Sequence, residues 1–335
     1  MKLHHPKFRT LFSWLCLLLV ILIILIPLIS IFTYYDFRLS LKLTDYVSSI
    51  IYFTFYQSLL SAFLSIIAGS LFAYLLNTYK NYYLINLIAQ TQSILFVLPT
   101  IITVFGILSF YGNFFNIYGL TGILIGHVVL NTPIVSHIIY QTLNDISPSE
   151  KLLSTQMGLG KFSSFLASEW PIIKRNIPSL FVLVTFICFV SFTPVLILGG
   201  SPKYSTLEVS IYYSVIFSND FGTALNLLIF QLIICTIIYF IFFKNFKSEN
   251  FFIDEHRKVK TYFNFTIFNF LELIILLLIA VSIFMPIIFV IIKGLNFEII
   301  STIQSFYLWE SVYNTFIICL FSGIISTVLV YNLLI

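Results

Sequence analysis

Residues 15–26 read LCLLLVILIILI, a run made only of apolar residues. Together with its flanks the run covers roughly 12–35, whereas about 20 apolar residues suffice to cross the hydrocarbon core of a bilayer. The run does not alternate between polar and apolar residues as a strand of a membrane barrel does. It is also too long for the apolar part of a signal peptide, and no small-residue cleavage site follows it. The stretch therefore predicts a transmembrane helix that is retained.

The composition of the whole chain extends this prediction. Hydrophobic residues make up 59% of the 335 residues and charged residues only 9%, whereas soluble domains have about 25% charged residues. So few charges cannot cover a surface that faces water. The composition excludes a disordered chain, a secreted disulfide scaffold and, because the net charge of +4 is spread along the chain, a nucleic-acid-binding protein.

Eight apolar runs are long enough to cross a bilayer, and each should be helical because lipid offers no partner to the backbone. They are roughly 12–35, 50–76, 84–110, 119–142, 179–200, 220–243, 266–292 and 311–335. The sequence thus predicts an all-α polytopic membrane protein with about eight transmembrane helices.

The basic residues predict the orientation of these helices. If the N-terminus is cytoplasmic, 13 of the 17 Lys and Arg residues fall in cytoplasmic segments. Such an excess is typical of the cytoplasmic side. We therefore expect a cytoplasmic N-terminus and two long cytoplasmic loops, 143–178 and 244–265.

Two parts of the chain are similar to each other. Residues 56–60 (YQSLL) correspond to 313–317 (YNTFI), and Pro27 corresponds to Pro286 at nearly the same spacing. Repeats of this kind mark duplicated units. We predict a first six-helix unit over 1–243, a cytoplasmic linker over 244–265, and an incomplete second unit of two helices over 266–335.

The cytoplasmic loop 143–178 has the pattern of two short helices. Residues 147–150 (SPSE) are typical of a helix start, and Gly158 and Gly160 should break that helix. After them, Phe162, Phe165, Leu166 and Glu169 share one helix face. Pro171 and Pro178 should end the loop before the next span. The pattern alone fits either a solvated connector or a helix that docks into a groove of a soluble partner.

The loop resembles the coupling loop of ABC importer permeases, which docks on the ATPase subunit. Gly158 and the pair Trp170-Pro171 match the Gly and the apolar-Pro pair of that motif, whereas its acidic and alanine positions fall on 152–154 (LLS) and do not match. The resemblance implies a type I ABC permease fold. It implies contact with the ATPase through Gln156, Met157, Gly158, Lys161, Phe162, Phe165, Leu166, Glu169, Trp170 and Pro171.

The surrounding sequence resembles one family of these permeases, that of the bacterial thiamine/thiamine pyrophosphate importers, strongly over 98–243. The matching stretches are 98–99 (LP), 104–108 (VFGIL), 111–112 (YG), 118–123 (YGLTGI), 127–128 (HV), 131–133 (NTP), 156–158 (QMG), 169–171 (EWP), 188–189 (CF), 191–192 (SF), 198–200 (LGG) and 206–209 (TLEV). Members of that family are fused proteins with two six-helix halves. This chain would cover the first half and part of the second.

Few polar residues lie inside the predicted spans. His127 and Asn131 are four residues apart, and Ser191 and Thr193 precede the Gly199-Gly200 pair. Intramembrane polar residues usually face the interior of a bundle. They could line a translocation pathway, although for His127 and Asn131 we favour hydrogen bonds between helices. Glu272 lies near the cytoplasmic end of its span and should extend toward the interface.

No residue pattern predicts covalent chemistry or a bound cofactor. The four cysteines, Cys16, Cys188, Cys235 and Cys319, all lie in apolar runs, where they should be small packing side chains and not metal ligands. The chain is therefore expected not to be an enzyme.

The resemblance implies a multi-pass permease of the bacterial inner membrane that imports thiamine or thiamine pyrophosphate. Its partners would be cytoplasmic ATPase subunits that use ATP, a periplasmic binding protein, the lipid bilayer, and a second permease copy or half. Four alternatives stay open at this point: a permease for ferric iron, a permease for another small solute, an ion-coupled secondary transporter, and an inactive truncated permease. No acidic residue lies at the centre of a predicted span, which disfavours the ion-coupled class.

Overall fold

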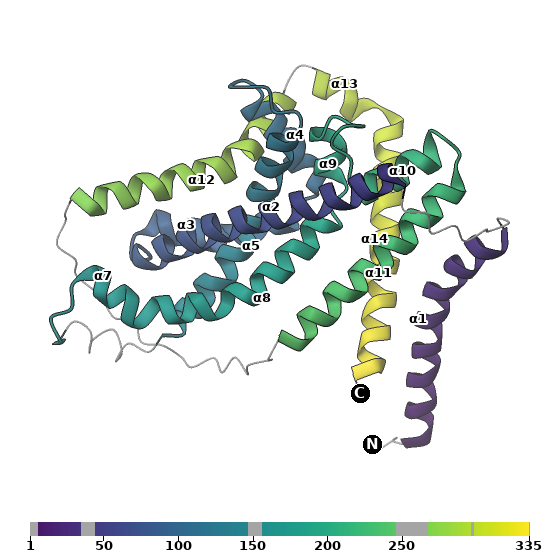
Figure 1. Cartoon of the computed structure of the whole chain (residues 1–335), viewed down its shortest axis with the longest axis horizontal. Helices are drawn as coiled ribbons and strands as arrows, with labels where there is room; N and C mark the ends of the chain where they lie inside the picture. Colours follow the sequence, from purple (N-terminus) through teal and green to yellow (C-terminus); the bar gives the residue numbers. More distant parts are fainter. Residues whose placement is uncertain (1–5, 35–43, 147–155, 246–266, 296–297, 335) are drawn as a thin grey trace. The chain divides into compact units, whose positions relative to one another are not determined.

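A computed structural model describes the chain except for residues 1–5, 35–43, 147–155, 246–266, 296–297 and 335. Every regular element within the described residues is a helix (Figure 1). The elements are α1 (Pro6–Tyr34), α2 (Asp45–Thr78), α3 (Tyr83–Val97), α4 (Thr100–Tyr111), α5 (Leu120–Asn144), α7 (Lys161–Ser164), the π-helix η1 (Phe165–Glu169), α8 (Trp170–Phe189), α9 (Thr193–Leu198), α10 (Leu207–Ile216), α11 (Phe221–Asn245), α12 (Ile267–Gly294), α13 (Glu298–Gln304) and α14 (Phe306–Leu334).

The chain divides into two compact units, each described by itself. One unit consists of Met1–Ser40 and Lys293–Ile335, and the other of Leu41–Ile292. In the first unit α1 lies against α14, and the Ser13 hydroxyl donates to the Asn332 carbonyl oxygen at 2.8 Å. Most side chains of α14 are exposed within this unit.

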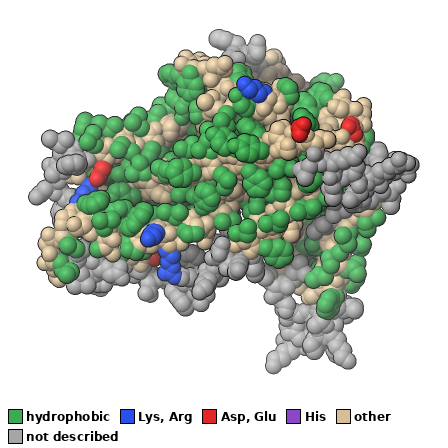
Figure 2. Space-filling model, in the orientation of Figure 1, with side chains coloured by type: hydrophobic (Ala, Val, Ile, Leu, Met, Phe, Trp, Pro, Cys, Tyr) green, Lys and Arg blue, Asp and Glu red, His purple; other side chains and the backbone are tan. Residues whose placement is uncertain are grey.

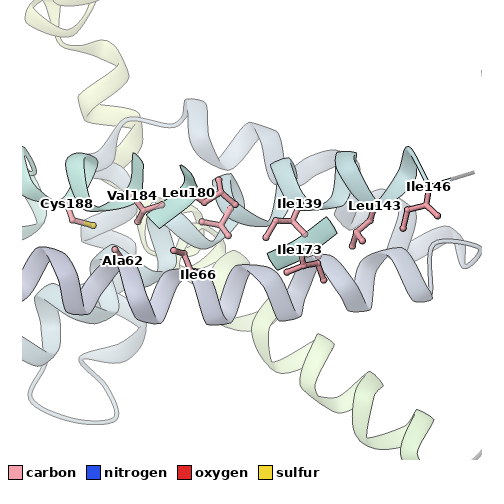
Figure 3. Packing of buried hydrophobic residues seen from close by; sticks show 11 residues of the cluster. Ala62, Ile66, Ile139, Leu143, Ile146, Ile173, Leu180, Val184 and Cys188 are labelled. Carbon is pink, nitrogen blue, oxygen red and sulfur yellow. The ribbon is translucent and has the colours of Figure 1, made fainter. Parts of the chain in front are cut away.

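The core of the larger unit forms where α2 packs along α5 and α8. Figure 3 shows this contact, with Ala62 and Ile66 of α2 facing side chains of α5 and α8. The close approach depends on Gly69, because a Cβ added there would lie 2.6 Å from the Cβ of Val135. Small residues at such contacts are typical of membrane helix pairs, which depend on close packing for their stability.

A second apolar cluster joins α12 to α2 and α3. Leu276, Ala280 and Ile283 of α12 pack with Phe72 and Leu76 of α2. A Cβ added to Gly106 of α4 would lie 2.3 Å from the Pro286 carbonyl oxygen of α12. The helix that follows residues 244–265 is therefore part of the same unit as α2 to α11. The predicted domain boundary stays a prediction, since most of that segment lies outside the described residues.

The outward surface is mostly apolar. Figure 2 shows hydrophobic side chains over most of the described surface on one face, with few charges. Within the part of the chain that the structure describes, six helical stretches are long and apolar enough to cross a membrane: Asp45–Thr78, Leu120–Asn144, Lys161–Phe189, Phe221–Ile241, Asn269–Gly294 and Phe306–Asn332. The chain is an all-α polytopic membrane protein, as predicted.

Two of the predicted continuous runs are interrupted. The run 84–110 consists of α3 and α4, which separate at Leu98-Pro99. Proline lacks an amide proton and restricts the residue before it, so a helix usually ends there. The run 179–200 is also split, because α8 ends at Phe189 and α9 begins at Thr193. Hydropathy alone did not indicate either break.

The predicted end of the cytoplasmic loop at Pro171 and Pro178 stays a prediction, but neither proline interrupts the helix. Helical structure is continuous over Lys161–Phe189 and includes both prolines. The turn directly before Pro171 is the π-helix η1, in which the Trp170 amide donates to the Phe165 carbonyl oxygen. A wider turn of this kind accommodates a residue that cannot donate to the preceding turn. The predicted loop helix and the next span are thus one continuous rod.

Candidate functional site

The segment 156–171 begins at a backbone turn that glycine makes possible. Gly158 has φ +67° and Gly160 precedes α7, and nothing lies within 4 Å of a Cβ added at either position. The predicted break at these two glycines is confirmed. The predicted helix start at 147–150 lies outside the described residues.

The aromatic residues of this segment point in two directions. Phe162 is 73% exposed and Leu166 is 44% exposed, one helical turn apart. Phe165 instead is partly buried and packs against the core cluster, with its ring centre 4.8 Å from that of Tyr74 and 6.2 Å from that of Trp170. Phe162 and Leu166 therefore form an apolar surface open to a partner, whereas Phe165 fixes the segment to α2.

Most of the other predicted coupling residues are also exposed. Met157 is 75% exposed, and Gln156, Trp170 and Pro171 are also exposed. Glu169 accepts a long hydrogen bond of 3.5 Å from the Asn77 side chain near the end of α2. The segment thus combines an open apolar tip with polar attachment to the bundle.

Lys161 anchors the start of the segment to α12. Its ammonium lies 2.5 Å from Glu272 Oε2 and donates to Asn269 Oδ1 at 3.0 Å. The Tyr79 hydroxyl donates to the same Glu272 oxygen at 2.7 Å. Burial and the hydrogen bond to Glu272 raise the pKa of Tyr79 well above its usual value. Glu272 is therefore held in a polar cluster. The sequence had predicted instead a side chain that extends toward the membrane interface.

A second group of polar side chains lies in the interior of the unit. His127 of α5 is 1% exposed and is hydrogen-bonded through Nδ1 to Ser61 of α2 and through Nε2 to Ser191, each at 2.9 Å. One turn along α5, the Asn131 amide donates to Cys188 Sγ at 3.2 Å. These bonds join α2, α5 and the end of α8. His127, Asn131 and Ser191 are thus brought together, whereas Thr193 is the first residue of α9.

Sequence reasoning missed the contribution of α2 to this interior network. Its buried face carries Thr54, Gln57, Ser58, Ser61 and Ser65. The spacing of three or four residues between these polar residues within an apolar run was the available signal. Gln57 donates to the Cys188 carbonyl oxygen at 3.0 Å, so this face shares the network with α8.

Removing the central member of the network should destabilise the unit. We expect His127→Leu to lower the free energy of unfolding by about 2 kcal/mol, since it removes the two hydrogen bonds that His127 makes to the Ser61 and Ser191 hydroxyls. Thermal unfolding in detergent micelles measures this loss. Adding Ser61→Ala and Ser191→Ala should recover part of it, and an unchanged unfolding midpoint for His127→Leu would contradict the assignment.

A small hollow lies at the end of the unit opposite the segment 156–171. It has a volume of about 170 Å³ and lies near the start of α2. Its lining residues are Tyr46, Ser201, Pro202, Ser205, Ser210 and Tyr213. Among the described residues, no three His, Cys, Asp or Glu side chains lie close enough to hold a metal ion.

The structure is thus that of a helical membrane protein with a buried polar network and an exposed apolar pair, Phe162 and Leu166. No known family model matches the chain. Known relatives do. The chain is 35% identical over 210 residues to the thiamine transport system permease protein ThiP of Haemophilus influenzae, covering 58% of this chain and 39% of that protein.

Further relatives match over more of the chain. Identity to the ThiP protein of Escherichia coli is 29% over 313 residues, covering 87% of this chain and 57% of that protein. Identity to the ThiP protein of Brucella abortus is 28% over 284 residues, covering 78% and 51%. The chain thus spans roughly half the length of these relatives. The matches confirm the resemblance to the thiamine importer permeases predicted from the sequence.

Proposed function

We propose that this chain is the transmembrane permease subunit of an ATP-driven importer that carries thiamine or thiamine pyrophosphate from the periplasm into the cytoplasm. The observation that carries the proposal is the similarity over 87% of the chain to a permease named for thiamine transport. The exposed pair Phe162 and Leu166, located at the coupling-loop motif, supports it independently of the substrate.

In this proposal the N-terminus and the segment 156–171 lie in the cytoplasm, in agreement with the distribution of Lys and Arg. The chain itself binds no cofactor and forms no covalent intermediate, since ATP is used by the partner ATPase. A periplasmic binding protein delivers the substrate to the end that carries the hollow near Tyr46. A second permease copy or half completes the pathway.

The geometry supports a mechanical route from the ATPase to the membrane interior. Phe162 and Leu166 lie near the start of the continuous helical rod Lys161–Phe189. At the other end of this rod, Cys188 accepts from Asn131 and Ser191 is bonded to His127. A displacement of the coupling segment on ATPase closure would move the rod as a body. The polar bonds between α2, α5 and α8 would then rearrange and change access to the pathway.

The test is uptake of labelled thiamine by cells that produce this chain with the ATPase and binding protein of such an importer. We expect uptake that stops when the ATPase cannot hydrolyse ATP and continues when the proton gradient is collapsed. Uptake of ferric iron in place of thiamine would assign the substrate differently. If collapsing the proton gradient stops uptake while the ATPase remains active, the chain is a secondary transporter. If no uptake occurs although the protein is stable, the chain is an inactive permease.

A further inference from the structure

The polar cluster around Glu272 connects three segments that are distant in the sequence. Lys161 is the first residue of α7, Tyr79 follows the end of α2, and Asn269 and Glu272 lie near the start of α12. Glu272 Oε2 receives both the Lys161 ammonium at 2.5 Å and the Tyr79 hydroxyl at 2.7 Å. The Lys161 ammonium also lies 5.6 Å from the centre of the Tyr79 ring.

The acceptor side of the cluster is fixed to the bundle. Asn269 and Glu272 are three residues apart on α12 and face the same neighbour, because both accept from Lys161. One turn further along, Leu276 is buried among side chains of α2 and α3. The carboxylate therefore has a defined position relative to α2. The side chains of Lys161 and Glu272 are only 27% and 22% exposed, so water screens the pair incompletely.

The donor side belongs to a segment whose first described residues, 156–160, are exposed. Gly158 and Gly160 precede Lys161, and nothing lies within 4 Å of a Cβ added at either glycine. The next residue, Phe162, is 73% exposed. The Lys161 contacts therefore fix the start of this segment to α12, whereas Phe165 fixes its next turn to α2.

We propose that Glu272 is a positioning residue that holds the coupling segment in register through Lys161. This inference rests on the proposed function for its transport readout. A charged hydrogen-bonded pair is strong and directional, so neutralising one member loosens the segment without removing volume. Motion of the ATPase would then be transmitted less completely to the continuous helix Lys161–Phe189. More ATP would be hydrolysed for each substrate molecule transported.

The experiment compares Glu272→Gln with Glu208→Gln. Glu208 is a partly buried carboxylate in α10 that accepts from Gln231 at 2.5 Å, and no hydrogen bond or ion pair among the described residues joins it to the segment 156–171. We expect Glu272→Gln to lower the substrate transported per ATP hydrolysed by about tenfold, the size expected for loss of a hydrogen bond to a charged group. Glu208→Gln should transport as the unmodified chain does.

A second readout requires neither substrate nor ATPase. A spin label at position 162 of the purified chain should become more mobile in Glu272→Gln and in Lys161→Gln, but not in Glu208→Gln. The charge reversal Lys161→Glu with Glu272→Lys should restore the lower mobility. If the unmodified complex fails to transport thiamine, the proposed function is contradicted. The mobility of the spin label still tests whether Glu272 positions the segment through Lys161. Equal mobility in Glu272→Gln and Glu208→Gln would overturn the inference, whatever the transport result.

Discussion

Phe162→Ala should abolish most ATP-driven uptake while leaving the folded chain intact. Phe162 is 73% exposed in the free chain and lies in the segment 156–171, for which we propose the coupling role. Removing an aromatic anchor from the centre of a protein interface costs about 2 kcal/mol or more. This corresponds to an about 30-fold weaker affinity for the ATPase. The measurement is the dissociation constant for the ATPase, together with uptake by the assembled complex.

Phe217→Ala is the matched control for this prediction. Phe217 is 66% exposed, but it follows the end of α10, away from the coupling segment. Its removal should leave affinity for the ATPase unchanged. A similar affinity for both variants would mean that the apolar tip does not bind the motor subunit.

Gly69→Ala should destabilise the contact between α2 and α5 in the core of the larger unit. The added Cβ would lie 2.6 Å from both the Cβ and the Cγ1 of Val135, and 3.2 Å from the Ser136 amide nitrogen. Neither neighbour is the end of a flexible side chain, so α2 and α5 must separate. Overpacking of this kind costs about 1–3 kcal/mol, and we expect the upper end of that range.

Thermal unfolding in detergent measures this cost, with Gly222→Ala as the control. Gly222 lies in the first turn of α11, where an added Cβ would meet only Asp220 Oδ1 at 3.5 Å, an ordinary contact. Its substitution should leave the unfolding midpoint nearly unchanged. Equal midpoints for the two variants would show that the contact of α2 with α5 is looser than described.

The helices were predictable because the bilayer imposes a simple requirement on length and polarity. That requirement carries no information about which helix faces which neighbour. A prediction from length and polarity alone therefore missed the break at Leu98-Pro99, the short helix α10 and the continuity of helix through Pro171 and Pro178. In each case local backbone chemistry or tertiary contact decided the result, and neither changes the mean hydropathy of a run.

The candidate site was predictable only in part. The coupling motif and the glycine turn at Gly158 were evident from local sequence, and His127 was notable as a polar residue in an apolar run. The partners of these residues were not, since Ser61 precedes His127 by 66 positions and Glu272 follows Lys161 by 111. The inward rotation of Phe165 toward Tyr74 was also hidden, because helical spacing placed it with Phe162.

The most direct test is a crosslink from the tip of the coupling segment to the ATPase. Single cysteines are placed at positions 162, 166 and 217 after Cys16, Cys188, Cys235 and Cys319 have been replaced. We predict crosslinks to the ATPase from 162 and 166 in an assembled, transporting complex, and none from 217. A transporting complex that forms no crosslink from 162 or 166 would contradict the assignment of this segment as the coupling site.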